Sequence, residues 1–367
     1  MTIAAVFIIV IISIGLIIQK IRAGINVQKS RKFFTDAQLA LTQFVLAETD
    51  APANAPQSVT QKNALEAMVR QLFRVSVEKF AQARSHRRDI LREVMLDFSL
   101  NLTGETQARL DFAFQALGFV AEEMKAARSK KWWIRARACH RLRLMHALDA
   151  IEVLSQNLED DNEDVRIEAA LSLLEIVGVG ALSPILLTIK DISGWMRVRI
   201  SNTILGFGGE AVPHLIEGMK SNNYRVKKFC IEMLGRLGDV SAVQTLIEYM
   251  GYDVPEVQIA SLEAFGKIGD HRAIPIIIKY AKSENEQYRL AAARALGNLG
   301  SPATVSVLNE LLLHDTIEVR LAAAEALTKI GQLGIKTLEY SAHSENEDAK
   351  KVAIQFLHER TVLKTTY

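Results

Sequence analysis

A 31-residue period in the C-terminal part of the chain restricts its fold more than any other feature. Four segments that begin near Val226, Val257, Tyr288 and Val319 align without gaps. Their anchor positions are Lys227, Gln258, Arg289 and Arg320. Seven residues later come Leu234, Phe265, Leu296 and Leu327, and eleven residues later come Gly238, Gly269, Gly300 and Gly331. A fixed period of this length indicates a repeat array.

Each 31-residue unit has the pattern of two helices joined by a short turn. The first helix ends at the glycine, which tolerates the left-handed backbone of a helix C-terminus. Neither helix can bury its apolar face alone, so each pair has to stack on the next one. Small residues that allow close helix approach are Ala291, Ala292, Ala322 and Ala323. The sequence therefore predicts an all-α protein with an α–α superhelix.

Segments such as VQIASLEAFGKIG from Val257 and VRLAAAEALTKIG from Val319 resemble HEAT repeats. The resemblance is to the short variety, about 30 residues long, of phycobilin-lyase-like proteins. It is strong from Val226 to Ala342 and less regular in the copies that begin at Val165 and Val198. It implies a HEAT-repeat solenoid over residues 130–362 with a truncated C-terminal cap, and protein binding on the solenoid surface.

The stretch Arg128–Leu144, RSKKWWIRARACHRLRL, combines seven Lys or Arg residues and two tryptophans with no acid. Ile134 lies 31 residues before Val165, so the stretch is predicted to be the first helix of the array. In that register Cys139, Leu142 and Met145 face the core, while Arg137, Arg141 and Arg143 point away. Trp132 and Trp133 are expected to pack where the array begins. The run also resembles the first repeat of bacterial membrane-anchored HEAT proteins.

Residues 3–18 are almost entirely apolar. As a helix they span about 24 Å, close to the ~30 Å hydrocarbon core of a bilayer. No basic residue precedes them and no small-residue cleavage motif follows, which favours a retained anchor over a cleaved signal peptide. We expect a transmembrane helix within residues 1–22, integrated into the membrane through residues 3–21.

Basic residues directly after this apolar segment predict its orientation, because positive flanks stay in the cytoplasm. The first acid, Asp36, comes after all of them. The chain is thus predicted to be a single-pass protein of the inner (cytoplasmic) membrane with its soluble domain in the cytoplasm. Cys139 and Cys230 lie in apolar helical patterns, which fits buried thiols in a reducing compartment.

Between the anchor and the array, residues 23–61 are predicted to form a juxtamembrane helix and a flexible linker. Residues 62–129 are predicted to form a small bundle with helices over 62–85, 88–100 and 105–128. Residues 1–150 carry 22 basic and 13 acidic side chains, a net charge of +9, whereas residues 151–367 carry 22 and 29, a net of −7. Two surroundings are indicated.

Basic clusters in the first half could contact an anionic membrane leaflet. The alternative is ordinary solvated charge. The candidate contact residues are Lys20, Arg22, Lys29, Arg31, Lys32, Arg87, Arg88, Lys130 and Lys131.

A stripe of charged residues recurs at the same positions of successive repeats. HEAT folds place this helical face on the concave side, so it could receive a segment of a protein partner. The alternative is a set of solvated i,i+4 pairs worth ~0.3–0.5 kcal/mol each. The stripe consists of Glu232, Arg236, Glu263, Lys267, Arg294, Asn298, Glu325 and Lys329.

No catalytic, cofactor or metal motif stands out. Phosphate-binding loops, zinc-binding His and Cys spacings and nucleophile elbows are missing from the sequence. His358-Glu359 is a single dyad, too few for the paired dyads of HEAT-type hydroxylases. The acidic run 159–164 is expected to cap a helix N-terminus.

The sequence therefore predicts a membrane-anchored cytoplasmic scaffold or adaptor, not an enzyme, that binds protein partners through its solenoid. An accessory subunit of a membrane enzyme complex is one form of that role. The alternatives are a phycobilin-lyase-like lyase or chaperone for a tetrapyrrole and a nucleic-acid-binding HEAT protein. The acidic solenoid and the membrane anchor argue against nucleic acid.

Overall fold

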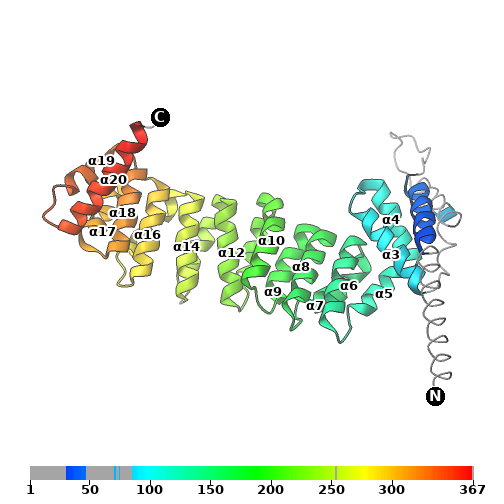
Figure 1. Cartoon of the computed structure of the whole chain (residues 1–367). Helices are drawn as coiled ribbons and strands as arrows, with labels where there is room; N and C mark the ends of the chain where they lie inside the picture. The colour runs from blue at the N-terminus through cyan, green and yellow to red at the C-terminus, as the bar shows by residue number, and fades with distance from the viewer. Residues whose placement is uncertain (1–29, 47–69, 72–73, 75–84, 253, 366–367) are drawn as a thin grey trace, which may run out of the picture. The chain divides into compact units, whose positions relative to one another are not determined.

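The computed structural model describes residues 30–46, 70–71, 74, 85–252 and 254–365 (Figure 1). Every element in these residues is an α-helix or a 3-10 helix, which confirms the predicted all-α class. The predicted transmembrane helix and the predicted linker lie outside the described residues, as does most of the helix expected over 62–85. The chain divides into two compact units, Met1–Leu154 and Ser155–Tyr367.

The first unit is a small helical bundle. Its core includes Phe44, Phe114 and Phe119, and Arg109 Nη1 joins two of its helices by donating to the Val45 carbonyl at 3.1 Å. The described helices are residues 30–45, α3 (Ser85–Ser99), α4 (Gly104–Ala116), α5 (Phe119–Ala126), α6 (Trp132–Leu144) and η2 (Leu148–Ala150), with α7 (Ile151–Asn157) at the division between the units.

Three expectations for this unit were wrong. The helix expected over 105–128 is broken, because Gly118 adopts a φ of 75° between α4 and α5. Arg141 does not point into solvent: it forms ion pairs with Glu93 and with the buried Glu123. The Trp132 and Trp133 side chains are not packed away but are 42% and 51% exposed. Cys139, Leu142 and Met145 are buried as predicted.

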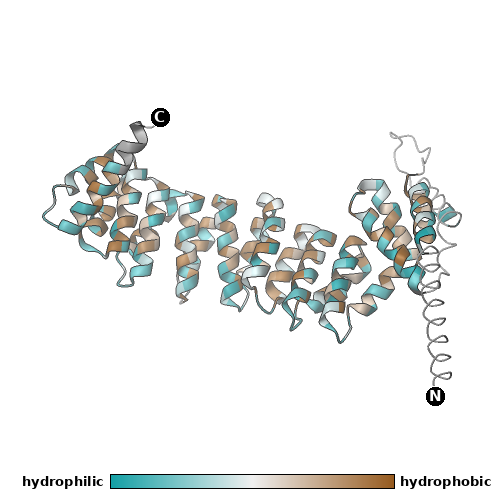
Figure 2. Cartoon of the chain, viewed as in Figure 1, coloured by the Kyte–Doolittle hydropathy of each residue, from teal (hydrophilic) through white to brown (hydrophobic). Residues whose placement is uncertain are grey.

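The second unit is a solenoid of helix pairs. The longer helices α8, α10, α12, α14, α16 and α18 follow one another in one layer, and the odd-numbered helices lie in a second layer (Figure 1). Apolar residues face the space between the layers, and polar residues face outward (Figure 2). The final helix α20 (Glu347–Thr365) packs on α18 and α19, at the place of the predicted cap.

The bounds of these helices follow the 31-residue period. They are α8 (Glu163–Val177), α9 (Leu182–Thr188), α10 (Gly194–Gly206), α11 (Ala211–Gly218), α12 (Tyr224–Leu237), α13 (Val243–Tyr249), α14 (Pro255–Ile268), α15 (Ile274–Ala281), α16 (Glu286–Leu299), α17 (Val305–His314), α18 (Ile317–Lys329) and α19 (Gln332–Ser341). Short 3-10 turns, such as η5 (Val240–Ala242), precede most of the odd-numbered helices.

Glycine and asparagine determine where the long helices begin and end. Gly238, Gly269 and Gly300 adopt the left-handed backbone at the C-caps of α12, α14 and α16, as predicted. The Asn162 side chain accepts hydrogen bonds from the backbone N–H groups of Asp164 and Val165 and so caps α8. The acidic run 159–164 therefore belongs to a helix cap, as the sequence indicated.

The anchor residues of the repeat connect successive helices. Lys227 Nζ donates to the Met219 carbonyl at 2.8 Å, and Gln258 Nε2 donates to the Met250 carbonyl at 3.0 Å. Each carbonyl lies at the C-terminus of the preceding helix, where no intrahelical donor is present. The tyrosine of the following repeat completes the contact, since Tyr249 and Tyr280 Oη donate to these same carbonyls at 2.9 Å.

Glycine brings the long helices close together. A Cβ atom placed on Gly235, Gly266 or Gly297 would lie only 2.9, 2.8 or 2.6 Å from the Cα of the facing alanine in the next long helix. These glycine–alanine contacts join α12 to α14, α14 to α16 and α16 to α18; the alanines are Ala264, Ala295 and Ala326. Only a glycine permits this backbone approach.

One stretch in the described part of the chain, Glu163–Thr188, is long and apolar enough to cross a membrane by length and composition. It comprises α8, the turn η3 (Gly178–Ala181) and α9. Its apolar side chains, including Leu173, Leu174 and Leu182, are buried in the solenoid core. This stretch is thus accounted for by helix packing.

Candidate protein-binding groove

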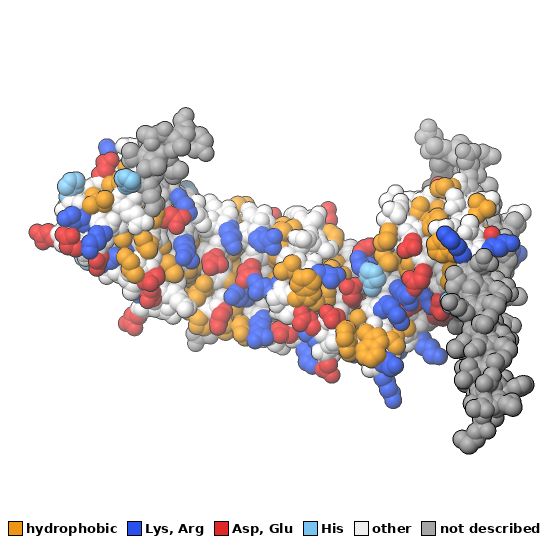
Figure 3. Space-filling model, viewed as in Figure 1, with side chains coloured by type: hydrophobic (Ala, Val, Ile, Leu, Met, Phe, Trp, Pro, Cys, Tyr) orange, Lys and Arg blue, Asp and Glu red, His pale blue; other side chains and the backbone are white. Residues whose placement is uncertain are grey.

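The predicted charged stripe lies on one face of four consecutive long helices. Glu232 and Arg236 are on α12, Glu263 and Lys267 on α14, and the other members on α16 and α18. All are exposed except Glu232, which is half-buried. Figure 3 shows basic and acidic side chains intermixed along the solenoid unit rather than separated into one-sign fields.

The stripe residues do not all pair as i,i+4 neighbours. Lys329 Nζ contacts Glu325 at 2.9 Å and donates to Asn298 Oδ1 at 3.1 Å. Glu232 instead pairs with Arg197 of α10, 35 residues away, and lies 4.0 Å from Lys228. Among the described residues no ion pair involves Glu263, Lys267 or Arg294, so these groups are available to a ligand.

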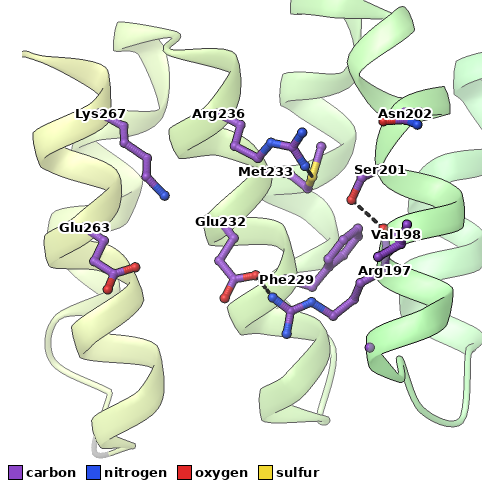
Figure 4. Close-up of a pocket in the computed structure, with 11 residues that line it drawn as sticks. Arg197, Val198, Ser201, Asn202, Phe229, Glu232, Met233, Arg236, Glu263 and Lys267 are labelled. Atoms are coloured by element: carbon purple, nitrogen blue, oxygen red, sulfur yellow. Dashed lines mark hydrogen bonds and ion pairs between the residues drawn. The ribbon is translucent and has the colours of Figure 1, made fainter.

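Half of the stripe lines an open groove of about 530 Å³. The groove lies between α10 and α12 and extends to α14 (Figure 4). Phe229 and Met233 form its buried apolar floor, and the side chain of Val198, 60% exposed, stands at its rim. The remaining lining residues are Gly194, Arg197, Ser201, Asn202, Glu232, Arg236, Glu263 and Lys267.

The groove opens where the glycine–alanine contacts stop. The positions 31 residues before Gly235 and Ala264 hold Ile204 and Met233, both buried. Two bulky side chains here keep α10 from approaching α12 as closely as α12 approaches α14. The space between the helices is left open over Phe229 and Met233.

Charge is arranged unevenly around the groove. Arg197 and Glu232 neutralise each other across it. Arg236, which contacts only the Met233 sulfur at 3.9 Å within the described residues, and Lys267 point along its opposite side (Figure 4). With Glu263 as the remaining acid, the unpaired groups leave a net positive rim above an apolar floor. This combination suits an apolar side chain with a neighbouring carboxylate.

A second hollow of about 290 Å³ adjoins the groove and shares Gly194 and Arg197 with it. It includes Tyr224, Arg225 and Lys228 of α12. Arg225 Nη1 pairs with Asp191 at 2.9 Å. Trp195, 57% exposed, is a neighbour of these residues in sequence.

Sequence reasoning missed the α10 side of the site. Arg197 and Val198 do not fall on the 31-residue register of the stripe, so periodicity gave no reason to select them. A usable signal was present: Trp195 and Val198 are large apolar residues that a core cannot absorb together with Met196 and Ile200, which are buried.

The predicted membrane contacts occupy different environments. Lys20, Arg22 and Lys29 lie outside the described residues, and Arg31, Lys32, Lys130 and Lys131 are exposed. Arg87 is exposed over the Phe33 ring, 5.4 Å from its centroid. Arg88 is half-buried and donates to the Leu117 carbonyl at 2.8 Å and to Glu122 at 2.6 Å, so its charge is already used.

Titratable groups give no sign of a reaction centre in the described part of the chain. No cluster of three or more His, Cys, Asp or Glu side chains is arranged there to hold a metal. Cys139 and Cys230 are buried free thiols, and burial raises the pKa of the Cys230 thiol, which keeps it protonated. The buried Glu123 has a raised pKa because of desolvation, which Arg141 and Arg92 partly offset.

Comparison with known proteins supports the repeat identification. Residues 212–289 and 274–358 match the family model of HEAT repeats, so this part of the chain is a HEAT-repeat array. No curated protein matches the chain.

Several solved structures are similar to the chain. An engineered protein is 20% identical over 88% of this chain and 98% of its own, with a TM-score of 0.39. The CpcE–CpcF complex of phycocyanin lyase from Nostoc sp. PCC7120 is 22% identical over 66% and 87%, with a TM-score of 0.31. The YibA protein of Escherichia coli is 13% identical over 76% and 100%, with a TM-score of 0.40. These likenesses say nothing about function.

Proposed function

We propose that the chain is a membrane-anchored cytoplasmic scaffold whose solenoid binds a segment of a protein partner in the groove between α10 and α12. The observation that carries the proposal is the combination of an open apolar floor with unpaired charges at its edge. Such a combination is typical of binding sites that take an apolar anchor and orient it by polar contacts.

A protein segment fits the groove better than the alternative ligands do. A nucleic acid requires a predominantly positive surface, whereas Glu232 and Glu263 lie in the groove and the solenoid half is acidic. A tetrapyrrole requires a deeper apolar enclosure than an open groove with two exposed cations. The partner segment we expect carries an apolar side chain over Met233 and a carboxylate near Arg236 and Lys267.

The membrane part of the proposal rests on the amino-acid sequence. Residues 3–18 are apolar and basic residues follow them directly, which predicts an anchor with the rest of the chain in the cytoplasm. An accessory subunit of a membrane enzyme complex is the form of this role that brings a groove and an anchor together. Retention in alkali-washed membranes, lost on deletion of residues 3–21, tests the anchor.

Site-specific photo-crosslinking tests the groove. A crosslinking amino acid at Val198, on the groove rim, should capture a discrete partner from intact membranes. The matched control is Tyr340, which is 78% exposed on α19 in the other layer. Equal capture from Tyr340 would contradict the proposal.

Purified components then test the charges. With the captured partner, the double variant Arg236→Glu and Lys267→Glu should weaken binding at least tenfold, about 1.4 kcal/mol. Lys336→Glu changes an exposed lysine on α19 and should change the Kd less than twofold. An unchanged Kd in the double variant would show that the partner binds elsewhere.

A further inference from the structure

Two adjacent tryptophans at the start of α6 remain unburied in the first unit. The Trp132 and Trp133 rings are 42% and 51% exposed and meet edge to face, with their centroids 6.0 Å apart. The helix buries Ala138, Cys139 and Leu142 instead. Exposed tryptophan is costly in water, and neither ring is needed for the core of its own helix.

Positive charge surrounds these rings. Lys130 and Lys131 directly precede them, and Arg128 and Arg137 are exposed nearby in the chain. The Lys131 Nζ atom lies 5.5 Å from the centroid of the Trp133 ring. The sequence has no acid between Glu123 and Asp149, and Glu123 is buried between Arg92 and Arg141. The tryptophan patch, defined as Lys130, Lys131, Trp132 and Trp133, therefore lacks acidic neighbours along its own helix.

We propose that the tryptophan patch docks on an anionic lipid surface. Indole rings prefer the headgroup region of a bilayer, where the ring contacts apolar chains and the N–H group remains hydrated. Lysines beside the rings complement lipid phosphates and attract the patch to an acidic leaflet. The inference rests on the membrane anchoring in the proposed function and adds a second contact point to it.

Lipid fits the patch better than a protein partner does. Lysine is depleted at the centre of protein interfaces, whereas a polybasic site with interfacial aromatics is typical of membrane surfaces. The patch also narrows the predicted set of membrane contacts, because Arg88 is bound to Glu122 and the Leu117 carbonyl.

Fluorescence of the full-length chain tests the proposal, since its only tryptophans are Trp132, Trp133 and Trp195. In the Trp195→Phe variant, emission comes from the patch alone. Reconstituted into vesicles of phosphatidylcholine with 30% phosphatidylglycerol, this variant should lose at least half of its emission when brominated lipids replace the ordinary ones. The double variant Trp132→Phe and Trp133→Phe, which retains Trp195, should lose less than a tenth.

The charge contribution is tested separately. Lys130→Glu with Lys131→Glu, in the Trp195→Phe background, should reduce the quenching at least twofold, and so should vesicles of phosphatidylcholine alone. Equal quenching in neutral vesicles would overturn the charge argument. Thermal unfolding of each variant should match that of the parent chain.

The outcomes separate this inference from the proposed function. A chain that floats with vesicles but shows no quenching of the patch overturns the inference and leaves the anchor standing. A chain that does not float with either vesicle type overturns both. Protection of both rings from aqueous acrylamide by the purified partner, without quenching by brominated lipid, would assign the patch to a protein contact.

Discussion

Two parts of the solenoid, built from the same repeat, solve the packing of neighbouring long helices differently. From α12 to α18, glycine faces alanine at each step and the backbones approach closely. Between α10 and α12, Ile204 and Met233 occupy the corresponding positions and a groove remains. A repeat can therefore acquire a binding site by replacing two small residues, without any change in the order of its helices.

The other contacts between repeats follow the same division. Tyr249 and Tyr280 each donate to a carbonyl in the preceding repeat. The position 31 residues before Tyr249 holds Gly218, which has no hydroxyl to donate. The tightly stacked part is thus held by glycine–alanine contacts and tyrosines, and the step at the groove lacks both.

The largest effect is expected from adding one methyl group within the tight stack. In Gly297→Ala the new Cβ would lie 2.6 Å from both the Cα and the Cβ of Ala326, so α16 and α18 have to separate. We expect a loss of about 3 kcal/mol in the free energy of unfolding, measured by urea denaturation.

The matched control is Gly206→Ala at the end of α10, where an added Cβ meets nothing within 4 Å. There the lower entropy of the unfolded chain should leave stability unchanged or raise it by up to about 1 kcal/mol. Equal destabilisation by the two changes would show that close backbone approach is not what distinguishes the tight stack.

A smaller effect is expected from the ion pairs that join neighbouring repeats. In the tight stack, Arg289 Nε and Nη2 donate to both carboxylate oxygens of Asp315 at 2.6 and 2.7 Å, and the Asp315 side chain is only 8% exposed. Asp315→Asn should cost about 2 kcal/mol, because it leaves a charged group without its partner. At the groove step, Asp191→Asn breaks the solvent-exposed contact with Arg225 and should have little effect on the unfolding midpoint.

The pH dependence gives a second measure of the Asp315 pair. Burial raises the pKa of Asp315, but hydrogen bonds from Arg289 and the Thr316 backbone outweigh it and hold the pKa below its ordinary value. A lowered folded-state pKa stabilises the fold above the unfolded-state pKa, and this stabilisation disappears as the pH falls through the folded-state pKa. The stability difference between the parent and Asp315→Asn should therefore be greatest near neutral pH and shrink in acid.

The sequence predicted the parts of this fold that depend on local chemistry. Glycine at a fixed position ends α12, α14 and α16, and the 31-residue period places the helix pairs, because both follow from residue type and spacing. Gly118 ends α4 by the same chemistry, and the interruption was missed because no period marks it.

The groove could be predicted only in part. Arg236, Glu263 and Lys267 recur with the repeat and were identified as a binding face, although their role is untested. Arg197 was missed because its pairing with Glu232 crosses from one helix to the next. The opening between α10 and α12 depends on how bulky side chains space two backbones, a property that appears only once the helices are packed.

The smallest effect is expected from the tyrosine contacts of the tight stack. In Tyr280→Phe the ring keeps its edge-to-face contact with Tyr288, 5.2 Å between centroids, but the hydrogen bond to the Met250 carbonyl is lost. Because Gln258 still donates to that carbonyl, the cost should be about 1 kcal/mol, measured as a shift in the urea midpoint. Tyr340→Phe, at an exposed position, should leave the midpoint unchanged. If the two substitutions had the same effect, the tyrosine hydroxyl would contribute nothing to the stacking of repeats, and the glycine–alanine contacts alone would distinguish the closed steps from the open one.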